Sequence, residues 1–175
     1  MSGNRLAPPD RLRRLLARTR RRGARLLVIG IGNEILGDDA VGHLIAEELA
    51  PLSRDGFLAC GVGVAVENAG TLVRRHRPDV ALLVDAATGT GRLPWAFLPV
   101  LRLDTFCHST HSVPLPLLVG AWRADNPALQ AFFIGVAPGS NELGAPLTHR
   151  VAGARAEIVG IFRECLLAQT GEPRG

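Results

Sequence analysis

The sequence contains no lysine and no tyrosine, only three cysteines, and no apolar run long enough to cross a membrane. A membrane helix needs about 20 consecutive apolar residues, whereas the longest candidate, residues 26–31, is soon followed by Asn33, Glu34 and two aspartates. The arginine-rich start has the charge of a signal peptide, but its apolar part is short and no small-residue cleavage site follows. We therefore expect a cytoplasmic protein without a membrane span.

The cysteines do not indicate a disulfide framework. Cys60, Cys107 and Cys165 are odd in number and show no C-x-x-C spacing, which favours reduced thiols. The chain also has no G-x-S-x-G motif, and Cys107 only neighbours His108 in the sequence. Neither a serine nor a cysteine nucleophile is therefore indicated.

Positive charge is concentrated at the start of the chain. All 20 basic residues are arginine, and nine of them lie within residues 5–25. This segment lacks the aromatic side chains that stack on bases, so we expect no nucleic-acid partner. The pattern predicts an N-terminal extension, residues 1–24, that is flexible or helical, one folded domain over residues 25–170, and a tail over residues 171–175.

Apolar and polar segments alternate along the rest of the chain in a way that predicts strands and helices in turn. Such alternation is typical of a mostly parallel, doubly wound sheet with helices on both faces. We expect a single-domain α/β protein, a three-layer α/β/α sandwich with about five strands. Strands are predicted at residues 26–31, 57–62, 80–84, 96–101 and 132–136, and helices at about residues 39–50, 67–76, 113–121 and 148–168.

The first strand runs into a glycine turn and then into paired carboxylates at the start of a helix. A dinucleotide-binding loop also begins with Gly-x-Gly, but it needs a third glycine where this chain has Ile35. Asp38 and Asp39 occupy the helix amino-terminus that would otherwise receive a phosphate. Asp38 can be explained as a helix cap, but two adjacent aspartates exceed what capping requires, so a cation or a proton is the expected guest.

Two further residues extend this candidate site. Asp85 follows the apolar strand at residues 81–84, and His111 lies in a loop that returns toward the same edge of the predicted sheet. Asp39, Asp85 and His111 would supply two oxygen ligands and one nitrogen ligand, which suit a divalent ion such as nickel or zinc. Their separation in the sequence leaves open whether they meet.

Five segments resemble the motifs of the hydrogenase maturation endopeptidases, which process the large subunit of nickel-iron hydrogenases. The resemblance covers about residues 26–168. The matching segments are GIGNEILGDDAVG (residues 30–42), LVDAA (83–87), STHSVPL (109–115), IGVAP (134–138) and GAPLTHRV (144–151).

The resemblance implies an aspartyl-type endopeptidase that removes a C-terminal peptide from the nickel-loaded large-subunit precursor. By analogy, Asp39, Asp85 and His111 contact the nickel, which the precursor carries, and permanent binding of nickel by the enzyme is left open. Asp38 and Asp39 are the candidate catalytic residues, and Asp38 is the candidate general base toward water.

Two alternatives remain at this point. Peptidyl-tRNA hydrolases also open with a strand and Gly-x-Gly-Asn, but they need a tyrosine after the turn, and this chain has none. A non-catalytic nickel-binding maturation chaperone would keep the three ligands and leave the precursor uncut.

Overall fold

The computed structural model describes residues 6–103, 108–109 and 114–168 of the chain. Its main sheet has the strand order β2-β1-β3-β6-β4, and a short strand, β5, pairs with β3 outside this path. The strands are β1 (Leu26–Ile31), β2 (Phe57–Gly63), β3 (Val80–Thr88), β4 (Trp95–Pro99), β5 (His108–Ser109) and β6 (Gln130–Val136). The α-helices are α1 (Pro8–Arg21), α2 (Val41–Leu49), α3 (Ala69–His76), α5 (Leu115–Asp125) and α6 (His149–Leu167), joined by short 3₁₀ turns.

The four strands β2, β1, β3 and β6 are parallel, and β4 runs antiparallel beside β6. In β1 every residue is buried, because helices cover both faces of the sheet. The parallel strands all end at one edge of the sheet, which we call the carboxyl edge. In open α/β sheets this is the edge at which ligands bind.

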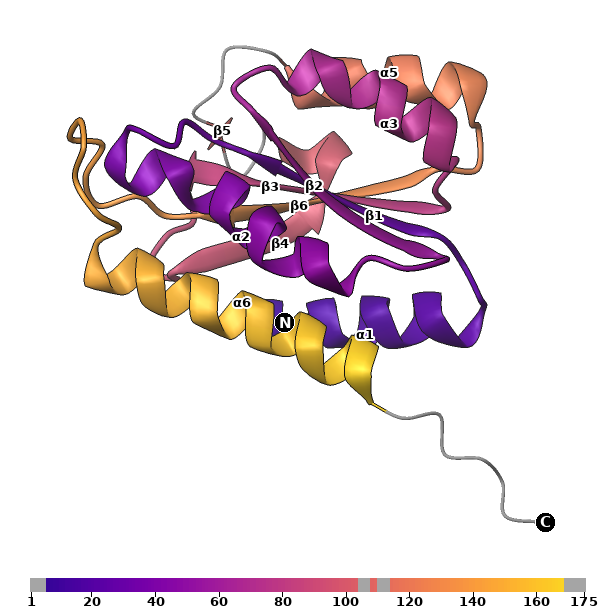
Figure 1. Ribbon diagram of the computed structural model, residues 1–175, viewed down its shortest axis with the longest axis horizontal. Coiled ribbons are helices and arrows are strands. Elements are labelled where there is room, and N and C mark those ends of the chain that lie inside the picture. The colour runs from indigo at the N-terminus through magenta and orange to yellow at the C-terminus, as the bar shows by residue number, and fades with distance from the viewer. Residues whose placement is uncertain (1–5, 104–107, 110–113, 169–175) are drawn as a thin grey trace, which may run out of the picture.

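Helices form a layer on each face of the sheet (Figure 1). Alternate residues of β1 face the two layers, since Val28 packs with α1, α2 and α6 whereas Leu27 and Ile29 pack with α3 and α5. The predicted fold class, a three-layer α/β/α sandwich with about five strands in the sheet, is confirmed. Within the described residues, no helix is long and apolar enough to cross a membrane.

The N-terminal segment contributes to the core. Leu12, Leu15 and Leu16 of α1 are buried in the cluster formed with α6 and the sheet. Arg11 lies over the ring of Phe97 in β4, with its guanidinium carbon 5.4 Å from the ring centroid. The predicted extension therefore contains a helix that is packed against the domain.

Strand β3 is longer than its apolar pattern predicts. The expected strand stops at Val84, but the ladder with β6 continues through Asp85 and Ala86. Backbone pairing with β6, and then with β5, keeps the chain extended to Thr88. Asp85 is therefore a strand residue, and Asp85 pairs with Gly135 of β6.

Candidate active site at the carboxyl edge

Glycines allow the start of α2 to lie directly on the carboxyl edge. A Cβ atom on Gly42 would collide with the carbonyl oxygens of Ile31 in β1 and Val84 in β3. A Cβ atom on Gly32 would collide with the carbonyl oxygen of Asp39, and Gly32 also has φ +153°, which L side chains rarely adopt. This close approach brings the 3₁₀ turn Gly37–Ala40, which carries both aspartates, against β3.

Asp38 is fully buried and joins two loops that are distant in the sequence. One carboxylate oxygen, Oδ2, accepts hydrogen bonds from the backbone N–H groups of Gly139 (2.7 Å) and Ser140 (2.9 Å) and from the Thr148 hydroxyl (2.9 Å). The other oxygen, Oδ1, accepts from the backbone N–H of Thr148 (2.7 Å). Asp38 therefore holds the loop between β6 and α6 against the loop that follows β1.

The hydrogen bonds of Asp38 keep its carboxylate ionised. Burial raises the pKa of Asp38, but the hydrogen bonds from Thr148, Gly139 and Ser140 together outweigh burial and leave the pKa below its usual value of 3.8. A carboxylate with four donors and a lowered pKa is a weak proton acceptor. This geometry favours a positioning role for Asp38 over the role of general base predicted from the sequence.

Asp39 is also buried, with 7% of its surface exposed. Its Oδ2 accepts a hydrogen bond from the backbone N–H of Asn33 at 3.2 Å. Asn33 also shapes the turn, since its side-chain oxygen accepts from the N–H of Ile35 and its carbonyl accepts from the N–H of Leu36. The Gly-x-Gly-Asn sequence thus fixes the backbone around Asp39.

Asp85 is completely buried in the middle of the sheet, beside Val84. Because Gly42 lies against the carbonyl of Val84, and Asp39 precedes Gly42 by three residues, Asp39 and Asp85 belong to the same part of the carboxyl edge. Both side chains offer carboxylate oxygens, a donor type that suits divalent ions.

His111, the third predicted ligand, lies outside the described residues, as does Cys107. Nearby described backbone belongs to β5, where Ser109 pairs with Ala87 and His108 with Thr88. The segment before His111 therefore runs beside the end of β3 that carries Asp85. Within residues 6–103, 108–109 and 114–168, no group of three or more His, Cys, Asp or Glu side chains is arranged to hold a metal ion.

The loop between β6 and α6 is part of the site, although the sequence did not predict this. This loop provides all the donors to Asp38, and its backbone also contacts the first loop: Asp38 N–H donates to the Ser140 carbonyl, and Gly144 N–H donates to the Ile35 carbonyl. The sequence did indicate possible hydrogen-bond donors here, because a Gly-Ser pair and a threonine before a long helix supply backbone N–H groups without partners in the helix. Nothing in the local sequence linked these donors to an aspartate about 100 residues earlier.

The hydrogenase 3 maturation protease of Escherichia coli K12 is 29% identical over 131 residues, covering 73% of this chain and 82% of that protein. The [NiFe] hydrogenase maturation protease HycI from Thermococcus kodakarensis has a similar structure, with TM-score 0.70, 27% identity, and 82% and 93% of the two chains covered. The hydrogenase maturating endopeptidase HybD from E. coli gives TM-score 0.66, 25% identity, and 82% and 93% coverage.

These similarities define the class of the protein, which is a peptidase, a hydrolase of peptide bonds. The chain is related to the hydrogenase maturation proteases, as its motifs predicted. No protein-family profile matches the chain. The two alternatives considered from the sequence, a peptidyl-tRNA hydrolase and a non-catalytic chaperone, are not supported by these relatives.

Proposed function

We propose that this protein is an endopeptidase that removes a C-terminal peptide from the nickel-loaded precursor of a nickel-iron hydrogenase large subunit. The main observation behind this proposal is the pair of buried carboxylates, Asp39 and Asp85, at the carboxyl edge of a fold shared with hydrogenase maturation proteases. A cytoplasmic location, expected from the sequence, is part of the same proposal.

Nickel belongs to the substrate in this proposal. Asp39 and Asp85 supply oxygen ligands, and His111 supplies a nitrogen ligand, so the donor set suits a divalent transition ion. A precursor without nickel offers no cation to offset the two carboxylates. Recognition of the ion would therefore restrict cleavage to precursors in which nickel insertion is complete.

The chain's own residues have separate roles in cleavage. Asp38 positions the turn that carries Asp39 through its four hydrogen bonds, and Asn33 orients the Asp39 carboxylate from the other side. The ion, when bound, polarises the scissile carbonyl or lowers the pKa of a water molecule. Asp39, the other predicted catalytic residue, accepts a proton from the attacking water as the water adds to the scissile carbonyl, and it donates this proton to the departing amine when the C–N bond breaks.

The test uses two forms of one precursor, nickel-loaded and nickel-free, each incubated with this protein. We expect the nickel-loaded precursor to lose mass by one C-terminal peptide, and the nickel-free precursor to keep its mass. Mass spectrometry of the intact precursor measures both results. Unchanged mass in both samples contradicts the peptidase proposal for this substrate, and equal cleavage of both contradicts recognition of nickel.

A further inference from the structure

Exposed apolar side chains gather around the carboxyl edge. Among the described residues, seven large apolar side chains are exposed, and four of them lie on loops at this edge: Ile35, Val64, Leu93 and Leu143. Apolar side chains exposed together, with polar neighbours, are typical of surfaces that bind other proteins. Among the described residues, exposed apolar side chains therefore lie on the same edge as the candidate active site.

Two of these side chains belong to loops that the structure joins directly. Ile35 is 60% exposed and Leu143 is 70% exposed. Their loops are connected by a bridge between Leu36 and Leu143, and by the hydrogen bond from the Gly144 N–H to the Ile35 carbonyl at 2.8 Å. We call Ile35 and Leu143 the Ile35–Leu143 pair.

The loops of the Ile35–Leu143 pair are held in place by hydrogen bonds. Asp38 fixes the loop of Leu143 through Gly139, Ser140 and Thr148, and the side chain of Asn33 accepts a hydrogen bond from Ile35. A pre-ordered apolar surface binds with a smaller loss of conformational freedom than a flexible one. The apolar tips are thus exposed while the backbone below them is rigidly bonded.

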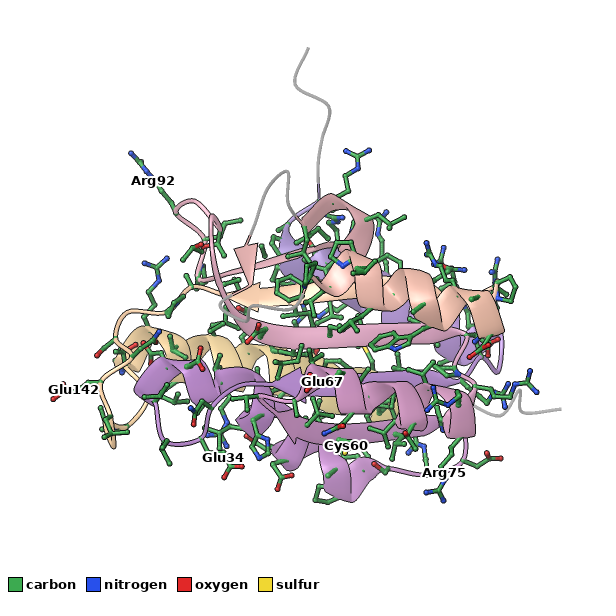
Figure 2. The ribbon with its side chains drawn as sticks, turned by 90° about the horizontal axis from the view of Figure 1, so that it is seen from above. Glu34, Cys60, Glu67, Arg75, Arg92 and Glu142 are labelled. Carbon is green, nitrogen blue, oxygen red and sulfur yellow. The ribbon has the colours of Figure 1, made fainter. Side chains whose placement is uncertain are left out.

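Negative charge accompanies both apolar tips. Glu34 precedes Ile35, and Glu142 precedes Leu143. Both glutamates lie on loops at the same end of the molecule (Figure 2). The imidazole Nε2 of His43 lies 3.0 Å from Oε1 of Glu34, whose side chain is still 62% exposed. Glu142 is also exposed, and its backbone N–H donates a hydrogen bond to the Ser140 hydroxyl. A surface of this kind complements a segment that carries apolar side chains next to basic ones.

We propose that the Ile35–Leu143 pair, with Glu34 and Glu142, is the docking surface for an apolar and basic segment of the precursor polypeptide next to the cleaved bond. This inference rests on the proposed function, since it assigns a second contact of the same substrate. Ile35 lies three residues before Asp38 in the chain, and the loop of Leu143 is hydrogen-bonded to Asp38 through Gly139 and Ser140, so a segment bound there lies beside the candidate active site. The contacts with nickel distinguish the nickel-loaded precursor from the nickel-free one, and the docking surface distinguishes the amino-acid sequence of this precursor from that of other proteins.

The experiment measures kcat and KM for cleavage of the nickel-loaded precursor by the double variant Ile35→Ser/Leu143→Ser. Both side chains are exposed, so the fold is expected to stay intact, which circular dichroism checks. We expect KM to rise at least tenfold while kcat stays within twofold. Leu101→Ser is the matched control, because Leu101 is 63% exposed but lies in the turn after β4, away from the carboxyl edge; its KM should stay within twofold.

A second pair of variants tests the charges. Glu34→Gln/Glu142→Gln should weaken the dependence of kcat/KM on salt, because charges at the rim of an interface act mainly on the association rate. Glu164→Gln, at an exposed position near the end of α6, should leave the salt dependence unchanged. An unchanged salt dependence in the Glu34/Glu142 variant overturns the charge part of the proposal.

The outcomes separate this inference from the proposed function. If the wild-type protein leaves the nickel-loaded precursor uncut, the proposed function is contradicted. The affinity of the same variants for the precursor, measured by calorimetric titration, then tests docking alone. An unchanged KM or affinity in Ile35→Ser/Leu143→Ser, or an equal loss in Leu101→Ser, overturns the docking surface. A wild-type dimer that the double variant dissociates, seen by sedimentation, also overturns it, since the pair would then contact a second copy of the chain.

Discussion

The carboxylate of Asp38 accepts hydrogen bonds from both the backbone N–H and the hydroxyl of Thr148, at 2.7 and 2.9 Å. Thr148 is the residue immediately before α6, and its hydroxyl makes no cap hydrogen bond to that helix. The Asp38 carboxylate therefore lies at the amino-terminus of α6, where negative charge is favourable. One buried aspartate in the first loop thus organises the start of the last helix.

Replacing Asp38 with Asn should destabilise the fold. An amide at this position presents an NH₂ group to donors that now point at a carboxylate, and it leaves buried N–H groups without acceptors. We expect a loss of about 2–4 kcal/mol in the free energy of unfolding, measured by urea denaturation. Asp55→Asn is the control, because Asp55 is exposed, and its effect should stay within about 0.5 kcal/mol. Equal stability of the two variants contradicts the role assigned to Asp38.

The same aspartate predicts a pH dependence. Its pKa in the folded protein is lower than 3.8, so the unfolded chain binds the proton more readily than the folded chain. The stabilisation is therefore complete above the unfolded pKa and is lost as the pH falls below about 3.8, through the folded pKa. Denaturation of the wild type and of Asp38→Asn at several pH values measures this; the difference in stability between them should shrink toward the acid end. A difference that stays constant with pH would show that the Asp38 charge does not contribute.

The contact between Gly42 and the strand carbonyls predicts a strong effect of one methyl group. In Gly42→Ala, the Cβ atom meets the backbone oxygens of Ile31 and Val84, neither of which can move without disturbing the sheet. We expect a loss of at least about 3 kcal/mol, or no folded protein. Gly153→Ala in α6 is the matched control, because nothing lies within 4 Å of its Cβ position, and it should stabilise the helix by about 0.5–1 kcal/mol. The denaturant concentrations at the unfolding midpoints of the two variants measure this difference in stability. Equal midpoints would contradict the close packing of α2 on the sheet.

Removing the negative charge of either candidate ligand, Asp39 or Asp85, should strongly reduce the cleavage activity. Asp39→Asn and Asp85→Asn keep the side-chain size but remove the charge that attracts the cation, so we expect cleavage of the nickel-loaded precursor to fall at least 100-fold. Intact-mass analysis over time measures the rate. Glu67→Gln serves as a control for a carboxylate at the same edge, since Glu67 lies at the surface beside α3. If the Asp variants retain full activity while folded, neither carboxylate contacts the reacting groups.

The sheet could be predicted from the sequence because its strands are apolar on both faces. Continuous runs such as residues 26–31 and 80–84 have few alternatives to a buried strand. The extension of β3 through Asp85 could not be predicted in this way, since a carboxylate interrupts the run and only pairing with β6 keeps it in the strand. Local patterns detect burial, whereas strand ends depend on partners that are distant in the sequence.

The part of the site that is formed by residues adjacent in the chain could be predicted from the sequence. The Gly-x-Gly-Asn turn and the paired acids are adjacent in the chain, so their local geometry follows from the sequence. The hydrogen bonds from the backbone N–H groups of Gly139 and Thr148 to Asp38 join segments about 100 residues apart. The spacing of apolar residues in the sequence does not predict such long-range contacts. The paired acids could be identified in the sequence, but the burial of Asp38 and its hydrogen-bond partners could be identified only in the fold.

Helix α1 gives the last prediction, because its arginine-rich sequence looks like a solvated extension while its leucines are buried. Leu12 is 0% exposed and packs in the cluster that contains α6, so Leu12→Ala should cost about 2–5 kcal/mol through lost burial and the cavity left behind. Arg14→Ala, two residues further along the same helix at an exposed position, should change stability by less than about 0.5 kcal/mol. Thermal or urea unfolding measures both variants. A Leu12→Ala protein as stable as the wild type would mean that α1 does not belong to the cooperative unit, whereas a large loss would mean that α1 unfolds together with the domain.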